Sequence, residues 1–253
     1  MKSLVFSQKN RKEMLRDPIS YIFCLGFPIV MLILMTIVNK SIPKESNMEI
    51  FQIKSLAASI PVFGLTFIML LNCLQVSKDR STAFLIRLYI SPMKPSEYIG
   101  GYTLPLILLS ILQIMITFVV SIILGAIGGY HFSVKNVILC LICLLPTVLL
   151  FIGMGMLAGT VLSEKAASGA CSIIISVTGI LGGIWMDLEN VKGSLGAISK
   201  MLPFYHGVRA SRMAIMGNYK DIANPLIVVS VYAVIIYSIA VIAFRNKMQK
   251  DSK

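Results

Sequence analysis

Six long apolar stretches dominate the chain, and short polar segments separate them. A helix of about twenty residues crosses the ~30 Å hydrocarbon core of a bilayer, and each stretch is at least that long. No lysine, arginine, aspartate or glutamate falls inside any of them, and a charge near the bilayer centre is costly. The pattern predicts an all-α polytopic membrane protein with six transmembrane helices. The predicted spans cover residues 19–38, 55–76, 102–127, 137–162, 166–186 and 225–244.

Two polar segments near these spans have a predicted structure. Residues 1–18 mix basic side chains with apolar ones, which favours an N-terminal interfacial helix on the cytoplasmic membrane surface. A disordered basic tail fits the same pattern. Residues 163–165 are the only polar residues between spans four and five. We therefore expect these two spans to form a tight helical hairpin.

A third segment, residues 187–224, is too polar and too interrupted for a seventh span. Aromatic side chains follow one another near its middle, and such side chains favour the membrane–water interface. The segment therefore predicts short re-entrant helices in the outer leaflet. Gly193, Gly196 and Pro203 are the expected breaks between them.

Polar and small side chains recur at helical spacing within three spans. The polar stripe of span three contains Ser110, Gln113, Thr117 and Ser121, and that of span five contains Ser168, Ser172 and Ser176. Such stripes should face protein or water rather than lipid. They predict either hydrogen bonds between helices or the lining of a substrate path. Gly155 and Gly159 in span four allow close helix packing, which we expect between spans four and five.

The composition excludes several classes of protein. Charged residues make up 13% of the 253 residues, hydrophobic residues 57%, and the mean hydropathy is +0.84. A water-soluble enzyme, a disordered chain and a disulfide-rich secreted domain do not have this composition. All five cysteines lie in apolar runs, where a thiol is usually a packing residue. Cys140 and Cys143 have the spacing of a metal pair, but no second pair or nearby histidine accompanies them, so no metal site is expected.

The net charge of +12 bears on topology rather than on nucleic-acid binding. Most lysines and arginines flank the spans on one side, in residues 1–18, 77–101 and 245–253. The positive-inside rule places that side in the cytoplasm, together with both termini. The basic segments would also contact anionic lipid headgroups. We therefore expect a multi-pass protein of the cytoplasmic, or inner, membrane.

The segment between spans two and three, residues 77–101, predicts a docking element. Residues 79–88 can form a short helix in which Phe84, Leu85 and Leu88 share one side, while Arg80 and Arg87 are exposed. Pro92 ends it, because a residue before proline disfavours the helical conformation. Such a helix fits a groove on another protein. An ordinary interfacial helix is the alternative.

Several short motifs, in this order, resemble those of the permease subunits of ABC-2 type ABC transporters. The first is Arg16-Asp17-Pro18 followed by Phe27-Pro28; the second runs from Asp79-Arg80 through Phe84-Leu85 and Arg87-Leu88 to Ser91-Pro92; the third is Leu202-Pro203 with Arg209. The resemblance extends over nearly the whole chain, as one transmembrane domain over residues 1–253. The chain departs from the family pattern at Ser81, Ala83 and Gly100-Gly101, within the coupling segment.

The resemblance implies two permease chains, as a homodimer or heterodimer, and two separate ATP-binding subunits. It implies that the coupling segment contacts the ATPase. The expected coupling residues are Asp79, Arg80, Phe84, Leu85, Arg87 and Leu88. ATP and magnesium would bind to the partner, because this chain lacks the phosphate-binding loop Gly-x-x-x-x-Gly-Lys-Ser/Thr. No cofactor and no catalytic residue are expected here.

The expected function is export of a hydrophobic or amphiphilic cargo, with a drug or antimicrobial peptide preferred. The substrate path would use Ser110, Gln113, Thr117, Ser168, Ser172 and Ser176. Export of a lipid-linked or polysaccharide cargo, and a non-transporting sensor that works with an ATPase, are the alternatives. An intramembrane enzyme is disfavoured because both histidines, His131 and His206, fall in predicted outer loops. A secondary transporter is disfavoured because no internal repeat is evident.

Overall fold

A computed structural model describes residues 2–43, 49–81, 95–188, 191 and 193–251. Within these ranges every regular element is helical. The α-helices are α1 (Lys2–Leu15), α2 (Pro18–Tyr21), α3 (Phe27–Ser41), α4 (Ile53–Ser81), α6 (Pro95–Ile127), α7 (Val134–Val161), α8 (Glu164–Leu181), α9 (Ser194–Met201), α10 (Pro203–Met216) and α11 (Ala223–Asp251). A π-helical turn spans Ile22–Gly26, and 3₁₀ turns span Glu49–Phe51 and Tyr219–Asp221.

Six of the described helical segments are long and apolar enough to cross a membrane, which confirms the predicted all-α membrane fold. They correspond to the six predicted spans. The π-helical turn belongs to the first of them. This turn directly precedes α3. Pro28, the second residue of α3, has no backbone N–H, so it cannot donate the usual helical hydrogen bond to the carbonyl one turn earlier.

The bounds of the spans differ from the prediction, and three of the differences bear on the site. Helix α4 continues to Ser81 and α6 begins at Pro95, so both ends of the expected loop 77–101 are helical. Helix α8 ends at Leu181, five residues earlier than expected. Gly182 and Gly183 follow it, and Gly183 has a φ of +77°, a left-handed conformation that stops a helix and favours glycine.

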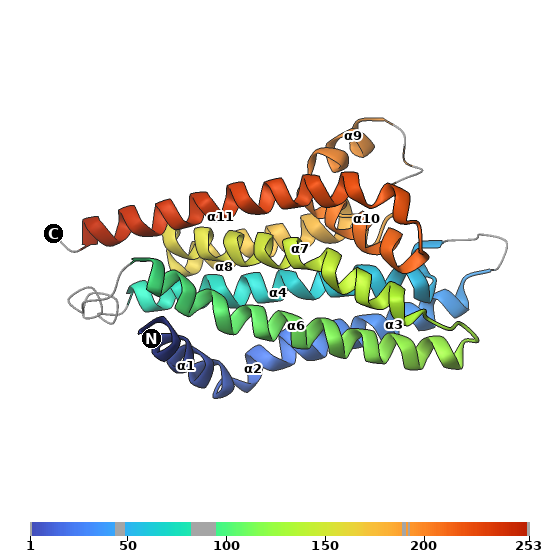
Figure 1. The fold of residues 1–253 in the computed structure, drawn as a ribbon, viewed down its shortest axis with the longest axis horizontal. Helices are drawn as coiled ribbons and strands as arrows, with labels where there is room; N and C mark the ends of the chain where they lie inside the picture. The colour runs from blue at the N-terminus through green and yellow to red at the C-terminus, as the bar shows by residue number, and fades with distance from the viewer. Residues whose placement is uncertain (1, 44–48, 82–94, 189–190, 192, 252–253) are drawn as a thin grey trace.

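The long helices form a bundle with α4 near its centre. Figure 1 shows both chain termini at one end of the bundle, here called the terminal end, and α9 and α10 at the opposite end, here called the distal end. Helix α4 packs against α7, α8, α6, α10 and α3, and most of its length is buried. Few residues of α3 and α11 are fully buried, as in lipid-facing helices.

The pair formed by α4 and α7 is the most closely packed part of the bundle around α4. A Cβ atom at Gly155 would lie 2.4 Å from the carbonyl oxygen of Met69, and one at Gly159 would lie 2.6 Å from that of Cys73. The side chain of Asn72 donates to the carbonyl of Ile152 at 2.7 Å. The expectation that Gly155 and Gly159 pack α7 against α8 is therefore wrong, because their open faces are filled by α4.

The segment 187–224, at the distal end, contains two short α-helices, α9 and α10, as the sequence predicts. Gly193 precedes α9 with a φ of +98°, and Pro203 begins α10. Gly196 is not a break: it lies inside α9, where a Cβ atom would come within 2.5 Å of the Val191 carbonyl oxygen. Helix α10 packs on α7 and α4, and Arg212 Nε donates to Ser59 Oγ of α4 at 2.9 Å.

Candidate functional site

The candidate site lies at the terminal end of the bundle, in the last turn of α4. Asp79 and Arg80 are in this turn. The four other predicted coupling residues, Phe84, Leu85, Arg87 and Leu88, lie outside the described residues. A short separate helix was expected to begin at Asp79. Residues 79–81 instead continue α4 without a break.

Arg80 lies against the C-terminal end of α7. Its Nη1 atom is 2.9 Å from the carbonyl oxygen of Gly159 and 3.2 Å from that of Leu162, and it also donates to the carbonyl of Thr160. The last carbonyls of a helix lack partners within the helix and carry partial negative charge. The guanidinium satisfies them. The expected exposed position of Arg80 is therefore wrong, because its side chain is half-buried against α7.

Asp79 faces a different neighbour. The Tyr102 hydroxyl of α6 donates to Asp79 Oδ2 at 2.7 Å, and the carboxylate is half-buried. Charges of Lys9 and Glu13 of α1 and of Lys78 interact with this carboxylate. Successive residues of a helix point about 100° apart. The neighbouring side chains of Asp79 and Arg80 therefore bind α6 and α7 respectively.

An aromatic cluster fixes α1 beside this turn. The Phe6 ring meets the rings of Tyr98 and Tyr102 edge-on, at centroid distances of 5.7 Å and 5.1 Å. Tyr102 in turn meets Phe244 of α11 at 6.2 Å. Gly101 leaves the space for this packing, since a Cβ atom there would lie 2.2 Å from Phe6 Cδ1.

A hydrogen bond closes the contact between α1 and α6. The buried Asn10 side chain donates to the carbonyl oxygen of Gly101 at 3.1 Å. Gly100 also lies close to α1, because a Cβ atom there would be 2.9 Å from Ser3 Oγ. The chain departs from the family pattern at Gly100-Gly101, and α1 packs against this pair of glycines.

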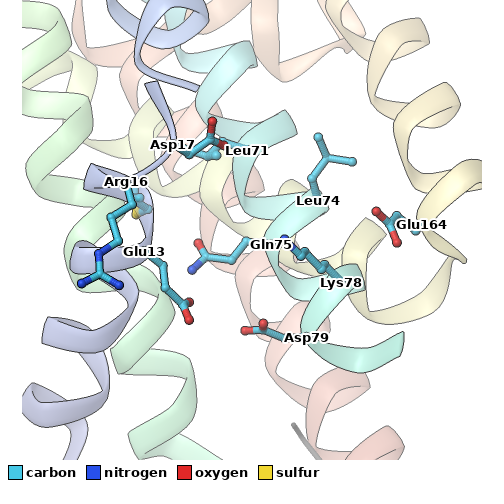
Figure 2. Close-up of a pocket in the computed structure, with 10 residues that line it drawn as sticks. Glu13, Arg16, Asp17, Leu71, Leu74, Gln75, Lys78, Asp79 and Glu164 are labelled. Carbon is cyan, nitrogen blue, oxygen red and sulfur yellow. The ribbon is translucent and has the colours of Figure 1, made fainter. Parts of the chain in front are cut away.

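A cleft of about 400 Å³ opens at the terminal end between α1, α4 and the start of α8. Figure 2 shows Gln75 and Asp79 extending from α4 toward the side where α1 carries Glu13, with Glu164 of α8 on the other side. The lining combines apolar side chains with charges of both signs. Its residues are Glu13, Met14, Arg16, Asp17, Leu71, Leu74, Gln75, Lys78, Asp79 and Glu164.

The polar stripe of α6 lies in the protein interior. Ser110, Gln113, Thr117 and Ser121 are all buried. The three hydroxyls donate to carbonyls one turn earlier in α6, and Gln113 Nε2 donates to Thr117 Oγ1 at 3.2 Å. Gly64 of α4 makes room for this amide, because a Cβ atom there would lie 2.1 Å from Gln113 Nε2. Within a single subunit the α6 stripe therefore packs between helices.

The polar stripe of α8 has a different environment. Ser172 and Ser176 are exposed and Ser168 is half-buried. The hydroxyl of Ser172 donates to the Ser168 carbonyl at 3.0 Å, and that of Ser176 to the Ser172 carbonyl at 3.1 Å. These bonds satisfy the hydroxyl protons but leave the polar face open. In a membrane such a face is suited to water or to another protein.

Three polar side chains that position the site do not stand out from the sequence. Asn10 and Tyr102 connect α1, α6 and α4, and Asn72 connects α4 to α7. Asn72 is the one with a sequence signal, since it is one of two amides, with Gln75, within the apolar run of span two. The partners of Asn10 and Asn72 are backbone carbonyls, which no side-chain pattern reveals.

The cysteines pack between helices. All five are buried free thiols. Among the described residues, no three histidine, cysteine, aspartate or glutamate side chains are grouped so that they could hold a metal ion.

Comparison with known proteins identifies the fold. The family model of the ABC-2 type transporters matches residues 3–216, from α1 to the end of α10. This range includes the last turn of α4, the aromatic cluster and both polar stripes. No curated protein matches the chain. Since the match covers most of the sequence, the chain belongs to the ABC-2 type transporter family and is a membrane permease subunit.

Proposed function

We propose that this permease exports a hydrophobic or amphiphilic cargo across the cytoplasmic membrane, driven by ATP hydrolysis in two copies of a separate ATP-binding subunit. The observation that carries this proposal is the position of Asp79 and Arg80. They are bonded to α6 and α7, and they come directly before the segment 82–94, which resembles the family's coupling element. Force applied to this segment would reach several helices at once.

The proposed contacts with the ATPase come from Phe84, Leu85, Arg87 and Leu88, which would enter a groove on the nucleotide-binding subunit. ATP and magnesium would be held by that subunit. The terminal end of the bundle would face the cytoplasm, in agreement with the excess of lysine and arginine around it. The charged cleft between α1, α4 and α8 would lie on the same side.

The proposed substrate path follows the exposed serine face of α8, formed by Ser168, Ser172 and Ser176. A second permease chain, identical or related, would cover this face and leave a path between the two copies. The α6 residues Ser110, Gln113 and Thr117 would support this path from the interior. Since no charge lies in the six apolar stretches predicted from the sequence, an amphiphilic drug or an antimicrobial peptide suits the path better than a small ion.

The test is reconstitution of the chain with its ATP-binding subunit in vesicles. We expect ATP-dependent uptake of at least one member of a panel of amphiphilic antibiotics and peptides into inside-out vesicles. Arg87→Glu should abolish uptake while the chain still inserts into the membrane, because the reversed charge disturbs the docking contact. Arg245→Glu, an exposed arginine of α11 at the same end, is the matched control.

Three results would contradict the proposal. One is transport by the chain without any ATPase, and another is unchanged uptake by the Arg87→Glu variant. The third is a complex whose ATPase responds to the panel compounds without moving any of them, which would favour the sensor function.

A further inference from the structure

The chain turns sharply between α7 and α8, and this turn depends on a side chain from α4. Helix α7 ends at Val161, Leu162 is extended, and α8 begins at Glu164. Leu162 N–H binds the carbonyl of Ala158, so the carbonyls of Gly159 and Thr160 need other donors. Arg80 Nη1 binds both of them and the Leu162 carbonyl as well.

All three of these bonds come from one guanidinium nitrogen, Nη1, of Arg80. A guanidinium carries several N–H donors and stays charged at neutral pH. A positive charge at the C-terminal end of a helix also interacts favourably with the helix dipole. Arg80 therefore holds the last turn of α4 against the turn that leads directly into α8.

On the opposite side of the same α4 turn, Asp79 connects α4 to other helices. Asp79 accepts from Tyr102, whose ring contacts Phe6 of α1 and Phe244 of α11. The last turn of α4 is thus linked to α6, α1 and α11 through Asp79, and to α7 and the start of α8 through Arg80. These contacts give a direct connection between the end of α4 and the α7–α8 turn.

We infer that Arg80 is a positioning residue that passes motion of the coupling segment to the α7–α8 turn, rather than a residue that contacts the ATPase. This inference rests on the proposed function. With Arg80 in place, displacement of the α4 end pulls on fixed backbone carbonyls and moves the start of α8. Without Arg80, the ATPase still binds and hydrolyses ATP, but the serine face of α8 does not follow.

The test measures a nucleotide-dependent change rather than stability. Hydrogen–deuterium exchange is followed at residues 159–176 of the purified permease–ATPase complex, without nucleotide and after trapping with ATP and orthovanadate. The Arg80→Gln variant should lose most of the nucleotide-dependent difference. Its ATP hydrolysis rate and its binding to the ATPase should match those of the unmodified complex.

Two further variants make the result specific. Arg80→Lys keeps the charge and should restore part of the nucleotide-dependent difference, and it replaces Arg80→Gln if that variant fails to fold. Arg245→Gln removes an exposed arginine at the same end and should behave like the unmodified chain.

Either of two outcomes would overturn the inference: an Arg80→Gln complex that keeps the full nucleotide-dependent difference, or one that no longer binds the ATPase. The second would make Arg80 a docking residue. An unmodified chain that binds no ATP-binding subunit would contradict the proposed function itself, and the binding assay detects this before any variant is compared.

Discussion

Phe6 occupies the space that any side chain at position 101 would need. A methyl group at Gly101 would lie 2.2 Å from the Phe6 ring, so the ring has to move. Phe6 is 5% exposed and packs on Tyr98 and Tyr102 of α6. Displacing its ring would therefore weaken the packing of α1 against α6. A single glycine therefore determines where α1 lies against α6.

Gly101→Ala should destabilise the protein by about 1–3 kcal/mol, the usual cost of overpacking. The measurement is thermal unfolding in detergent, together with the rate at which a protease cleaves α1. Gly169→Ala in α8 is the matched control, because nothing lies within 4 Å of its Cβ position. Equal melting temperatures for the two variants would contradict the close fit of Phe6 against Gly101.

At the scale of helices, α4 and α7 are packed closely against each other. Their backbones touch at Gly155 and Gly159, and Asn72 adds a hydrogen bond between them. The Phe6 ring next to Gly101 can change its rotamer, whereas the α4 carbonyls next to Gly155 and Gly159 belong to the helix backbone and cannot. A larger side chain at these positions therefore has to separate two helices along their length.

Gly155→Ala should consequently destabilise the protein more than Gly101→Ala does, even though both changes add one methyl group. The methyl at position 155 would meet the Met69 carbonyl oxygen at 2.4 Å, and the overpacking cost should reach the upper part of the ~1–3 kcal/mol range. Thermal unfolding of both variants beside Gly169→Ala checks this order. The reverse order would show that α4 and α7 separate easily.

The helices themselves could be predicted from the sequence because the bilayer fixes the length of an apolar span. Which helices meet could not. The spacing of Gly155 and Gly159 indicates that some helix approaches closely, yet it does not name α4 as the partner. Arg80 was expected to be exposed for a similar reason: its partners are carbonyls about eighty positions later, and a backbone carbonyl leaves no trace in a sequence.

At the scale of the whole molecule, the two polar stripes divide into an interior one and a surface one. The α6 stripe is enclosed by the subunit, whereas Ser172 and Ser176 of α8 are exposed. The sequence predicts both stripes but cannot separate them, because in both helices the polar side chains repeat every three or four residues. Only the arrangement of the bundle makes one face available to a second subunit.

The double change Ser172→Leu and Ser176→Leu should therefore reduce transport several-fold with little effect on the stability of the subunit. Surface changes usually alter stability by no more than about 0.5 kcal/mol. Transport in vesicles and thermal unfolding are measured together, with Ile173→Leu, an exposed position of the same helix, as the control. Undiminished transport would place the path elsewhere.

The central position of α4 also has a consequence for the order in which the protein is made. Helix α4 leaves the ribosome before α7, although α7 supplies the acceptors for Asn72 and Arg80. Until α7 has been synthesised, a membrane-inserted α4 presents an amide and a guanidinium without these carbonyls. A nascent chain released after residue 133 should therefore be recognised by membrane quality-control proteases, and one released after residue 166 should survive longer.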